Sequence, residues 1–261
     1  MGSLPSGGLG MKRYGLRDDQ FARIESLLPG RAGSVGREGE LGNRLFIEAV
    51  IGKFRSGAPW RDLPERFGAW KNIHTRFSRW SASGVWENLF KASAVDPDNE
   101  YAMIDATIVR AHQHSAGARK NGLDQAIERS RGGLTTKIHV IVDALGNPLT
   151  LSLTGGQVHD ITQAEALAAK VEPKALLADK SYDADRFIQS LEVRAIKPVI
   201  PPKSNRSIKR ECDFALYAER NLVERFFNYL KQFRGIATRS EKTARNFLGG
   251  LHSACALAWL K

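Results

Sequence analysis

The sequence is poor in cysteine and has no long apolar run. Cys212 and Cys255 are the only cysteines among 261 residues. They are too few for a disulfide framework, and they lack the paired spacing of a structural zinc site. The most apolar late stretch, 247–260, is too short to cross a bilayer and contains His252. These absences exclude a disulfide-rich secreted domain and a membrane-spanning chain, and they predict a reducing compartment.

Positive charge is abundant and unevenly distributed. The composition, 42% hydrophobic and 26% charged, is typical of a soluble globular protein. Lys and Arg number 39 against 28 Asp and Glu, a net charge of +11, and residues 197–261 alone carry 13 basic against 5 acidic side chains. This excess predicts a polyanionic partner, with nucleic acid ahead of a membrane surface. A basic surface that serves solubility alone is the alternative.

The first part of the chain divides into a leader and a helical region. Residues 1–13 are rich in Gly, Ser and Pro and contain a second methionine, Met11. We expect a disordered leader there, and the native start, Met1 or Met11, stays open. From residue 14 to residue 95, apolar side chains recur at helical spacing between Gly- and Pro-containing turns, which predicts a small all-helical domain.

One helix of this region carries a basic face. From about residue 69, Trp70, Ile73, Phe77 and Trp80 form an apolar stripe, and the polar side includes basic residues, namely Lys71, Arg76 and Arg79. Short helices joined by turns, one of them basic, predict a helix-turn-helix-like DNA-binding domain. A plain helical bundle with the tryptophans in its core is the alternative.

From residue 96 to residue 261 the pattern changes to short strands separated by helices. We expect strands at 101–110, 135–142, 148–153, 176–178 and 196–200, followed by helices up to residue 259. Three sequential strands extended by two strands after crossover helices match the ribonuclease-H-like arrangement. The predicted fold class is therefore α/β, a mixed sheet with flanking helices preceded by the all-helical domain, although other mixed sheets share parts of this order.

Two acidic residues stand where this sheet would bring carboxylates together. Asp105 lies inside an apolar strand, where an acid is costly unless it is paired or binds a cation. Asp179 directly follows the short strand at 176–178. Neighbouring strands lie about 5 Å apart, so we expect the two side chains to be close.

A third acid, Glu224, shares one helix face with three other polar residues. At about 100° per residue, these four side chains fall within a stripe about 60° wide: Tyr217, Arg220, Glu224 and Lys231. By pattern alone, an ordinary solvated face with an Arg220–Glu224 ion pair explains the stripe equally well.

Other charged residues have structural explanations. Asp143 fits a hairpin turn, Asp160 fits a helix cap with Gln163 at capping-box spacing, and Asp183 fits a cap or turn. Arg131 and Lys137, in a basic stretch at 129–137, are candidate phosphate contacts, with a solvated loop as the alternative for each.

Read together, these segments resemble the DDE transposases of bacterial insertion sequences, in particular the insertion-sequence-5-like group. The resemblance covers about residue 14 to residue 260. It is carried by an N-terminal block at 56–68, by Asp105-Ala106-Thr107 with His112, by blocks at 131–137 and 156–160, and by Ala178-Asp179-Lys180-Ser181-Tyr182-Asp183, in which the family often has Gly at the position of Ser181. Tyr217, Arg220, Glu224 and Lys231 match the Tyr-Arg-Glu-Lys signature of the group in residue type and spacing.

The resemblance implies a function and a set of roles. Asp105, Asp179 and Glu224 would be the catalytic, metal-binding triad for Mg²⁺, with Mn²⁺ as a substitute. Tyr217, Arg220 and Lys231 would contact DNA near the scissile bond. The expected activity is that of an Mg-dependent transposase. It would bind the terminal inverted repeats of its own element as double-stranded DNA, cleave the ends and join 3′-hydroxyls to target DNA.

Three further expectations accompany this activity. The protein would form a homodimer or a larger assembly on DNA, it would not bind membranes, and it would work in the bacterial cytoplasm, associated with the nucleoid. A non-catalytic DNA-binding regulator, or transposase remnant, is the alternative function. A ribonuclease-H-like nuclease without strand joining is a further one.

Overall fold

The computed structural model describes residues 15–30, 41–115 and 125–261. The predicted leader at 1–13, with Met11, lies outside these residues. The helical region contains α1 (Asp18–Glu25), α2 (Asn43–Ser56), α3 (Trp70–Ala82) and α4 (Val85–Ser93). The expected tryptophan stripe is largely buried, since Ile73, Phe77 and Trp80 face inward. The expected all-helical start of the fold is therefore present.

A mixed sheet follows the helices. Its strands are β1 (Ala102–Ala111), β2 (Glu128–Ser130), β3 (Gly133–Val142), β4 (Pro148–Gly155), β5 (Ala175–Leu177), β6 (Lys197–Val199) and β7 (Thr238–Arg239). β3 pairs antiparallel with both β1 and β4, whereas β5 is parallel to β1 and to β6. The order β4-β3-β1-β5-β6, with β3 antiparallel to the rest, is the predicted ribonuclease-H-like arrangement. The fold-class prediction is confirmed.

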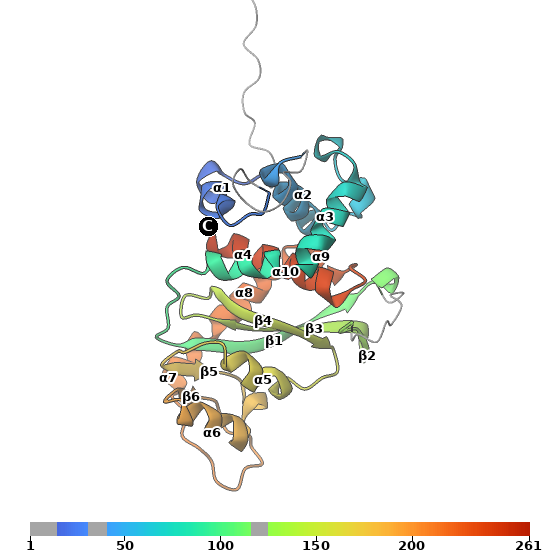
Figure 1. The fold of residues 1–261 in the computed structure, drawn as a ribbon. Helices are drawn as coiled ribbons and strands as arrows, with labels where there is room; N and C mark the ends of the chain where they lie inside the picture. Colours follow the sequence, from blue (N-terminus) through green and yellow to red (C-terminus); the bar gives the residue numbers. More distant parts are fainter. Residues whose placement is uncertain (1–14, 31–40, 116–124) are drawn as a thin grey trace, which may run out of the picture.

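Helices cover both faces of the sheet (Figure 1). Side chains alternate along β1, so Met103 and Val109 join the cluster that includes α8 (Asn221–Lys231) and α10 (Ala244–Trp259), whereas Ile104 points to the other face. That second face is covered by α5 (Ile161–Ala168) and α6 (Asp185–Val193). Asp105 follows the same alternation and shares a face with Met103, toward α8.

The end of the chain is more broken than the sequence indicates. Between β6 and α10 lie α7 (Phe214–Tyr217), a 3₁₀ turn at 218–220, α8, α9 (Arg234–Ala237) and β7. The sequence predicts a helical run with a break near Gly235, but neither β7, which pairs with the end of β1, nor β2 is expected from it. β2 and β7, three and two polar residues long, have neither a period nor the apolar run by which the equally short β5 is recognised.

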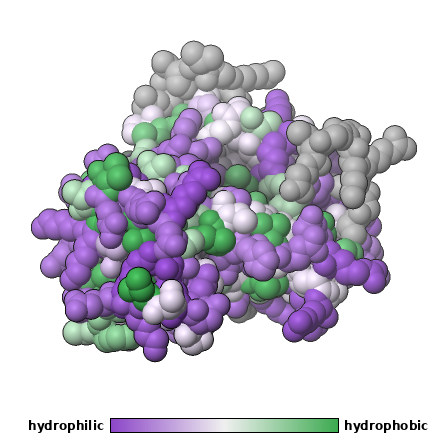
Figure 2. Space-filling view, turned by 90° about the horizontal axis from the view of Figure 1, so that it is seen from below, coloured by the Kyte–Doolittle hydropathy of each residue, from purple (hydrophilic) through white to green (hydrophobic). Residues whose placement is uncertain are grey.

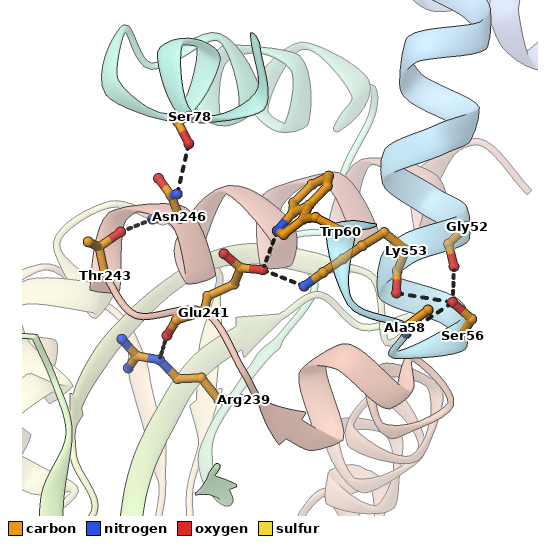
Figure 3. A network of polar contacts seen from close by, with 10 residues as sticks. All are labelled: Gly52, Lys53, Ser56, Ala58, Trp60, Ser78, Arg239, Glu241, Thr243 and Asn246. Atoms are coloured by element: carbon orange, nitrogen blue, oxygen red, sulfur yellow. Dashed lines mark hydrogen bonds and ion pairs between the residues drawn. The ribbon is translucent and has the colours of Figure 1, made fainter. Parts of the chain in front are cut away.

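The helical region shares its core with the end of the chain. The hydrophobic cluster that contains Phe46, Phe77 and Trp86 extends to Phe247 and Leu251 of α10. Figure 3 shows polar contacts across the same junction: Lys53 of α2 and Trp60 both point to Glu241, and Asn246 of α10 donates to Ser78 of α3. Helices far apart in the sequence are thus held together by apolar and polar contacts, and the predicted domain boundary at 95/96 stays a prediction.

The surface seen from the α6 end is mostly hydrophilic, with scattered apolar side chains (Figure 2). None of the helices in the described parts of the chain is long and apolar enough to cross a membrane.

Candidate active site

Two carboxylates meet where β1 and β5 run side by side. The parallel register pairs Ala102 with Leu176 and Met103 with Leu177. Two residues further along this register, Asp105 of β1 is level with Asp179, which directly follows β5. The sheet therefore places the two predicted acids on neighbouring backbone segments, at the spacing of adjacent strands, about 5 Å.

Glu224 joins them through Arg220. Glu224 lies in the first turn of α8, and Arg220 lies one turn before it. The Arg220 guanidinium donates from Nη2 to Asp105 Oδ2 at 2.5 Å and from Nη1 to Glu224 Oε1 at 3.2 Å. Arg220 thus does more than form a surface pair within one helix, because it connects α8 to the central strand of the sheet.

The site is partly buried and negatively charged. Burial raises the pKa of Asp105; Arg220 opposes this rise and Asp179 adds to it. Burial works against the charged form of Arg220, but the negative groups around it, Asp105 foremost, raise the pKa of Arg220 overall. A carboxyl group whose protonated form is favoured needs a nearby cation to stay ionised, and Arg220 supplies one.

The donor set suits a hard divalent cation, since three carboxylates are the ligands that Mg²⁺ and Mn²⁺ prefer. The arrangement differs from a formed metal site. No group of three Asp, Glu, His or Cys residues in the described parts of the chain is spaced to hold a metal ion. Asp105 Oδ2 and Glu224 Oε1 are bound to Arg220 instead, and Asp179 Oδ1 accepts from the amide of Ser181 at 2.8 Å.

The other two residues of the predicted stripe lie along the same segment. Tyr217 ends α7, is half-buried and packs edge-on against exposed Phe214, with 6.3 Å between ring centres. Lys231 is the last residue of α8 and is exposed. The segment from 217 to 231 is therefore not one unbroken helix, because the 3₁₀ turn at 218–220 precedes α8.

The predicted basic residues of α3 differ in their surroundings. Lys71 and Arg79 are exposed. Arg76 is half-buried, donates to Asn43 Oδ1, and lies over the rings of Phe46 and Trp80 at 4.3 and 4.9 Å. Arg76 therefore connects α3 to α2, and in this arrangement its guanidinium is engaged within the protein and not at the predicted DNA surface.

Arg131 and Lys137 also differ. Arg131 is exposed and, with Ile108, Arg110 and Thr135, lines a cleft of about 430 Å³. Lys137 is buried and donates to Asp160 Oδ1 at 2.7 Å and to the carbonyl of Val158 at 2.6 Å. The ammonium of Lys137 thus binds a carboxylate of the protein, whereas the sequence predicts that it binds a DNA phosphate.

The remaining acids are structural. Asp143 accepts from the amides of Leu145 and Asn147, as the predicted hairpin turn requires. Asp160 is the N-cap residue of α5, as predicted, but its side chain makes no capping hydrogen bond in the described structure, because the carboxylate accepts from Lys137 instead. Asp183 is buried and holds Arg206 and Arg210.

One buried group near the site was not singled out from the sequence. Tyr182, three residues after Asp179, is fully buried, and its hydroxyl has no hydrogen-bond partner among the described residues. Burial raises the pKa of this phenol, and the charges of Asp160, Asp105 and Asp179 raise it further. The only sequence signal was its place in the motif around Asp179.

Comparison with known families decides the class of the protein. A family model described as "Transposase DDE domain" matches residues 97–259, and one described as "Putative transposase of IS4/5 family" matches residues 16–90. The chain belongs to the transposase DDE-domain family. The predictions of an insertion-sequence transposase and of its enzyme class are therefore confirmed, and membership of this family implies dependence on a divalent metal.

Two relatives align with parts of this DDE transposase, and one of them is named as a putative transposase. The chain is 40% identical over 131 residues to a putative transposase for insertion sequence element IS6501 of Brucella ovis, a match that covers 49% of this chain and all of that protein. It is 49% identical over 107 residues to the uncharacterized protein y4sN of Sinorhizobium fredii, covering 41% of this chain and 84% of the relative.

Solved structures are more distant. The piggyBac transposase synaptic complex with hairpin DNA aligns with a TM-score of 0.38 and 12% identity, over 74% of this chain and 43% of that chain. The Mos1 mariner paired-end complex with Mn aligns with a TM-score of 0.28 and 13% identity, over 92% and 83% of the two chains.

Proposed function

We propose that this DDE transposase binds the terminal inverted repeats of its insertion sequence, hydrolyses the DNA ends and joins the 3′-hydroxyls to target DNA. The observation that carries the proposal is the meeting of Asp105, Asp179 and Glu224, from β1, the end of β5 and the start of α8, around Arg220. Three acids from three separate elements would repel one another without a cationic partner or substrate.

In this proposal the three carboxylates hold Mg²⁺, with Mn²⁺ as a substitute. When bound there, the metal would supply Lewis acidity that activates an oxygen nucleophile and stabilises the leaving oxygen of a phosphodiester. Asp105 and Asp179 are positioned by the sheet, whereas Glu224 is more exposed, with 60% of its side chain accessible. No side chain is required as a covalent nucleophile.

Cations around the carboxylates give the DNA backbone a place to bind. Lys231 is exposed at the end of α8, and Tyr217 and Phe214 present aromatic rings beside the site. Positive charge positions phosphates, and aromatic faces accept unpaired bases. Arg131 and Arg110, at the cleft farther along β1, extend the basic surface.

In this proposal the exposed face of α3 recognises the DNA sequence. Lys71, Asn72, Thr75 and Arg79 are exposed on this helix, whereas Ile73, Phe77 and Trp80 are buried. An α-helix fits the major groove, where Lys and Arg bind guanine, Asn binds adenine and Thr contacts either a base edge or the thymine methyl group. The face thus contains the side-chain types that read base edges.

The cellular setting is part of the proposal. We expect two copies, or a larger assembly, on DNA, because two element ends must be brought together before they are joined. The protein would act in the bacterial cytoplasm on nucleoid DNA and without contact to a membrane.

The test uses DNA that carries the repeats flanking the coding region, incubated with the full chain and Mg²⁺ or Mn²⁺. Glu224→Gln and Asp179→Ala should bind the ends but neither cut nor join them. Glu219→Gln is the matched control, because Glu219 is exposed on the same segment and makes no contact with the site in the described chain. Products are mapped at nucleotide resolution, and transfer of the 3′-hydroxyl is followed separately from nicking.

Three outcomes contradict the proposal in different ways. Normal cutting by Glu224→Gln would remove the third acid from the site. Nicking without transfer would indicate a nuclease. Tight end binding without any metal-dependent cut, for chains starting at Met1 and at Met11, would indicate a regulator.

A further inference from the structure

We propose that Arg220 acts as an internal cation that occupies the carboxylate site until DNA and metal bind, so that metal binding requires Arg220 to leave. Arg220 would then be a positioning residue that couples DNA binding to metal binding. This inference rests on the proposed function in one respect: it takes the anion that binds the displaced Arg220 to be a DNA phosphate. The contacts of Arg220 with Asp105 and Glu224 do not depend on that function.

The contacts of Arg220 are those of a bridging cation. One guanidinium nitrogen binds Asp105, which is 115 residues away in the chain, and another binds Glu224. Arg220 and Asp105 are partly buried, with 16% and 15% of their side chains accessible, whereas 60% of the Glu224 side chain is accessible. Charge-assisted hydrogen bonds in a partly buried site are stronger than exposed ion pairs, so this arrangement is more than a solvated contact.

Arg220 competes with a metal ion for the same two carboxylates. Asp105 Oδ1 accepts from the Ala106 amide at 2.8 Å and Oδ2 accepts from Arg220, so a metal ion would approach Asp105 against the positive charge of the guanidinium. Glu224 Oε1 also accepts from the guanidinium, at 3.2 Å. The positive charge held at both carboxylates disfavours a second cation there for as long as Arg220 keeps these contacts.

One hydrogen-bond donor of Arg220 has no acceptor in this position within the described structure. Its Nε is buried without a hydrogen-bond partner among the described residues. An arginine offers a planar fork that matches a phosphate with two parallel bonds. A DNA phosphate placed beside Tyr217 and Lys231 would offer Arg220 a better partner and would release Asp105 and Glu224 for metal. DNA and metal should therefore strengthen each other's binding, and this coupling is reciprocal.

The experiment measures Mn²⁺ binding by the full chain with electron paramagnetic resonance, first without DNA. In Arg220→Gln the neutral amide removes the competing charge, so the variant should bind Mn²⁺ at least about tenfold more tightly than wild type, the fold-change that corresponds to one charge-assisted hydrogen bond. Adding double-stranded DNA should tighten Mn²⁺ binding by the wild type but should change it little in Arg220→Gln.

Removing any nearby positive charge reduces the repulsion of a metal ion and so raises the Mn²⁺ affinity to some degree. A matched control is therefore needed. Arg225 is exposed, one residue after Glu224, and is absent from the contacts described around the site. Arg225→Gln removes the same charge from the adjoining helix, α8, and should change Mn²⁺ affinity by less than about threefold, as expected for a screened surface charge. Equal tightening in the two variants would overturn the proposal, and so would an unchanged affinity in Arg220→Gln.

A second variant protects the test against misfolding. Arg220→Lys keeps the charge but loses the fork that spans two carboxylates, so its Mn²⁺ affinity should fall between those of wild type and Arg220→Gln. Wild-type affinity in Arg220→Lys, together with wild-type coupling to DNA, would contradict the bridging role. The readout is Mn²⁺ binding and not DNA cutting. If the protein failed to cut DNA, the proposed function would be contradicted, but the Mn²⁺ affinities would still test the role of Arg220.

Discussion

Lys53 of α2 forms a buried ion pair with Glu241, a residue of the segment between β7 and α10 that lies 188 positions later in the chain. Only 1% of the Lys53 side chain and 6% of the Glu241 side chain are accessible. The indole of Trp60 donates to the same Glu241 oxygen at 3.0 Å (Figure 3). The Lys53 ammonium also lies 4.2 Å from the centre of the Phe54 ring. The pair connects the helical region to the end of the chain.

Breaking this pair on one side should be costly. Lys53→Met leaves the Glu241 carboxylate buried and without its cation, so we expect a loss of about 3–5 kcal/mol in the free energy of unfolding. The measurement is urea-induced unfolding. Lys91→Met is the matched control, because Lys91 pairs with Glu87 on the surface, and it should cost less than about 1 kcal/mol. Similar losses in the two variants would contradict the structural role of the buried pair.

The hydroxyl of Tyr182 should contribute nothing favourable to stability. It is buried without a partner among the described residues, while the ring packs in the cluster with Ile104 and Phe187. Tyr182→Phe keeps the ring and removes the unpaired hydroxyl, so the free energy of unfolding should stay equal or rise by about 1 kcal/mol.

Tyr229→Phe is the comparison for this prediction. The Tyr229 hydroxyl donates to the carbonyl of Ala254 at 3.4 Å, and its removal should cost about 0.5–1.5 kcal/mol. A clear loss of stability in Tyr182→Phe would show that its hydroxyl has a partner in solution.

Buried histidine should make the protein less stable in mild acid. Burial lowers the pKa of His252 to about 4, against about 6.5 for an unfolded chain. As the pH falls from about 6.5 to about 4, His252 becomes protonated in the unfolded chain but stays neutral in the native protein. The free energy of unfolding therefore decreases across this window. Between about pH 7.5 and about pH 5 this one residue should account for about 2 kcal/mol.

His252→Gln tests this pH effect. The variant should lose less free energy of unfolding than wild type between the two pH values, whatever its stability at neutral pH. Burial also lowers the pKa of His139 to about 4, so part of the pH dependence should remain in the variant. An unchanged pH dependence in His252→Gln would show that His252 titrates normally in the native protein.

The sequence predicts the sheet and the meeting of the acids because both depend on local patterns. Asp105 lies inside a long, largely apolar strand and Asp179 directly follows a short one, and parallel pairing of these strands is enough to bring the two residues together. The same local logic places Glu224 on a helix after the last predicted strand, 196–200. Short segments such as β7 give no such pattern, since two residues cannot show a period.

Partners of charged side chains were predicted less well. Lys137 and Asp160 are 23 residues apart, and each had a plausible local role, as a phosphate contact and as a helix cap. Their pairing depends on α5 folding back over β3, which residue spacing does not encode. Arg76 likewise lies on the polar side of its helix by angle, yet it bonds to Asn43, 33 residues earlier.

The different surroundings of Arg76 and Arg79 lead to a test of how α3 binds DNA. Arg79 is exposed, so Arg79→Ala should leave the free energy of unfolding within about 0.5 kcal/mol of wild type. If Arg79 reads a base edge, the variant should lose about 1–3 kcal/mol of binding at one position of the preferred DNA site.

Arg76→Ala should show the opposite pattern. It removes the bond to Asn43 and the packing over Phe46 and Trp80, so we expect a loss of about 1–3 kcal/mol in the free energy of unfolding and an unchanged base preference among the molecules that remain folded. Selection of binding sites from random double-stranded DNA by the full chain, without divalent metal, measures the preference for each variant. A changed preference in Arg76→Ala with none in Arg79→Ala would mean that another face of the helical region reads the DNA.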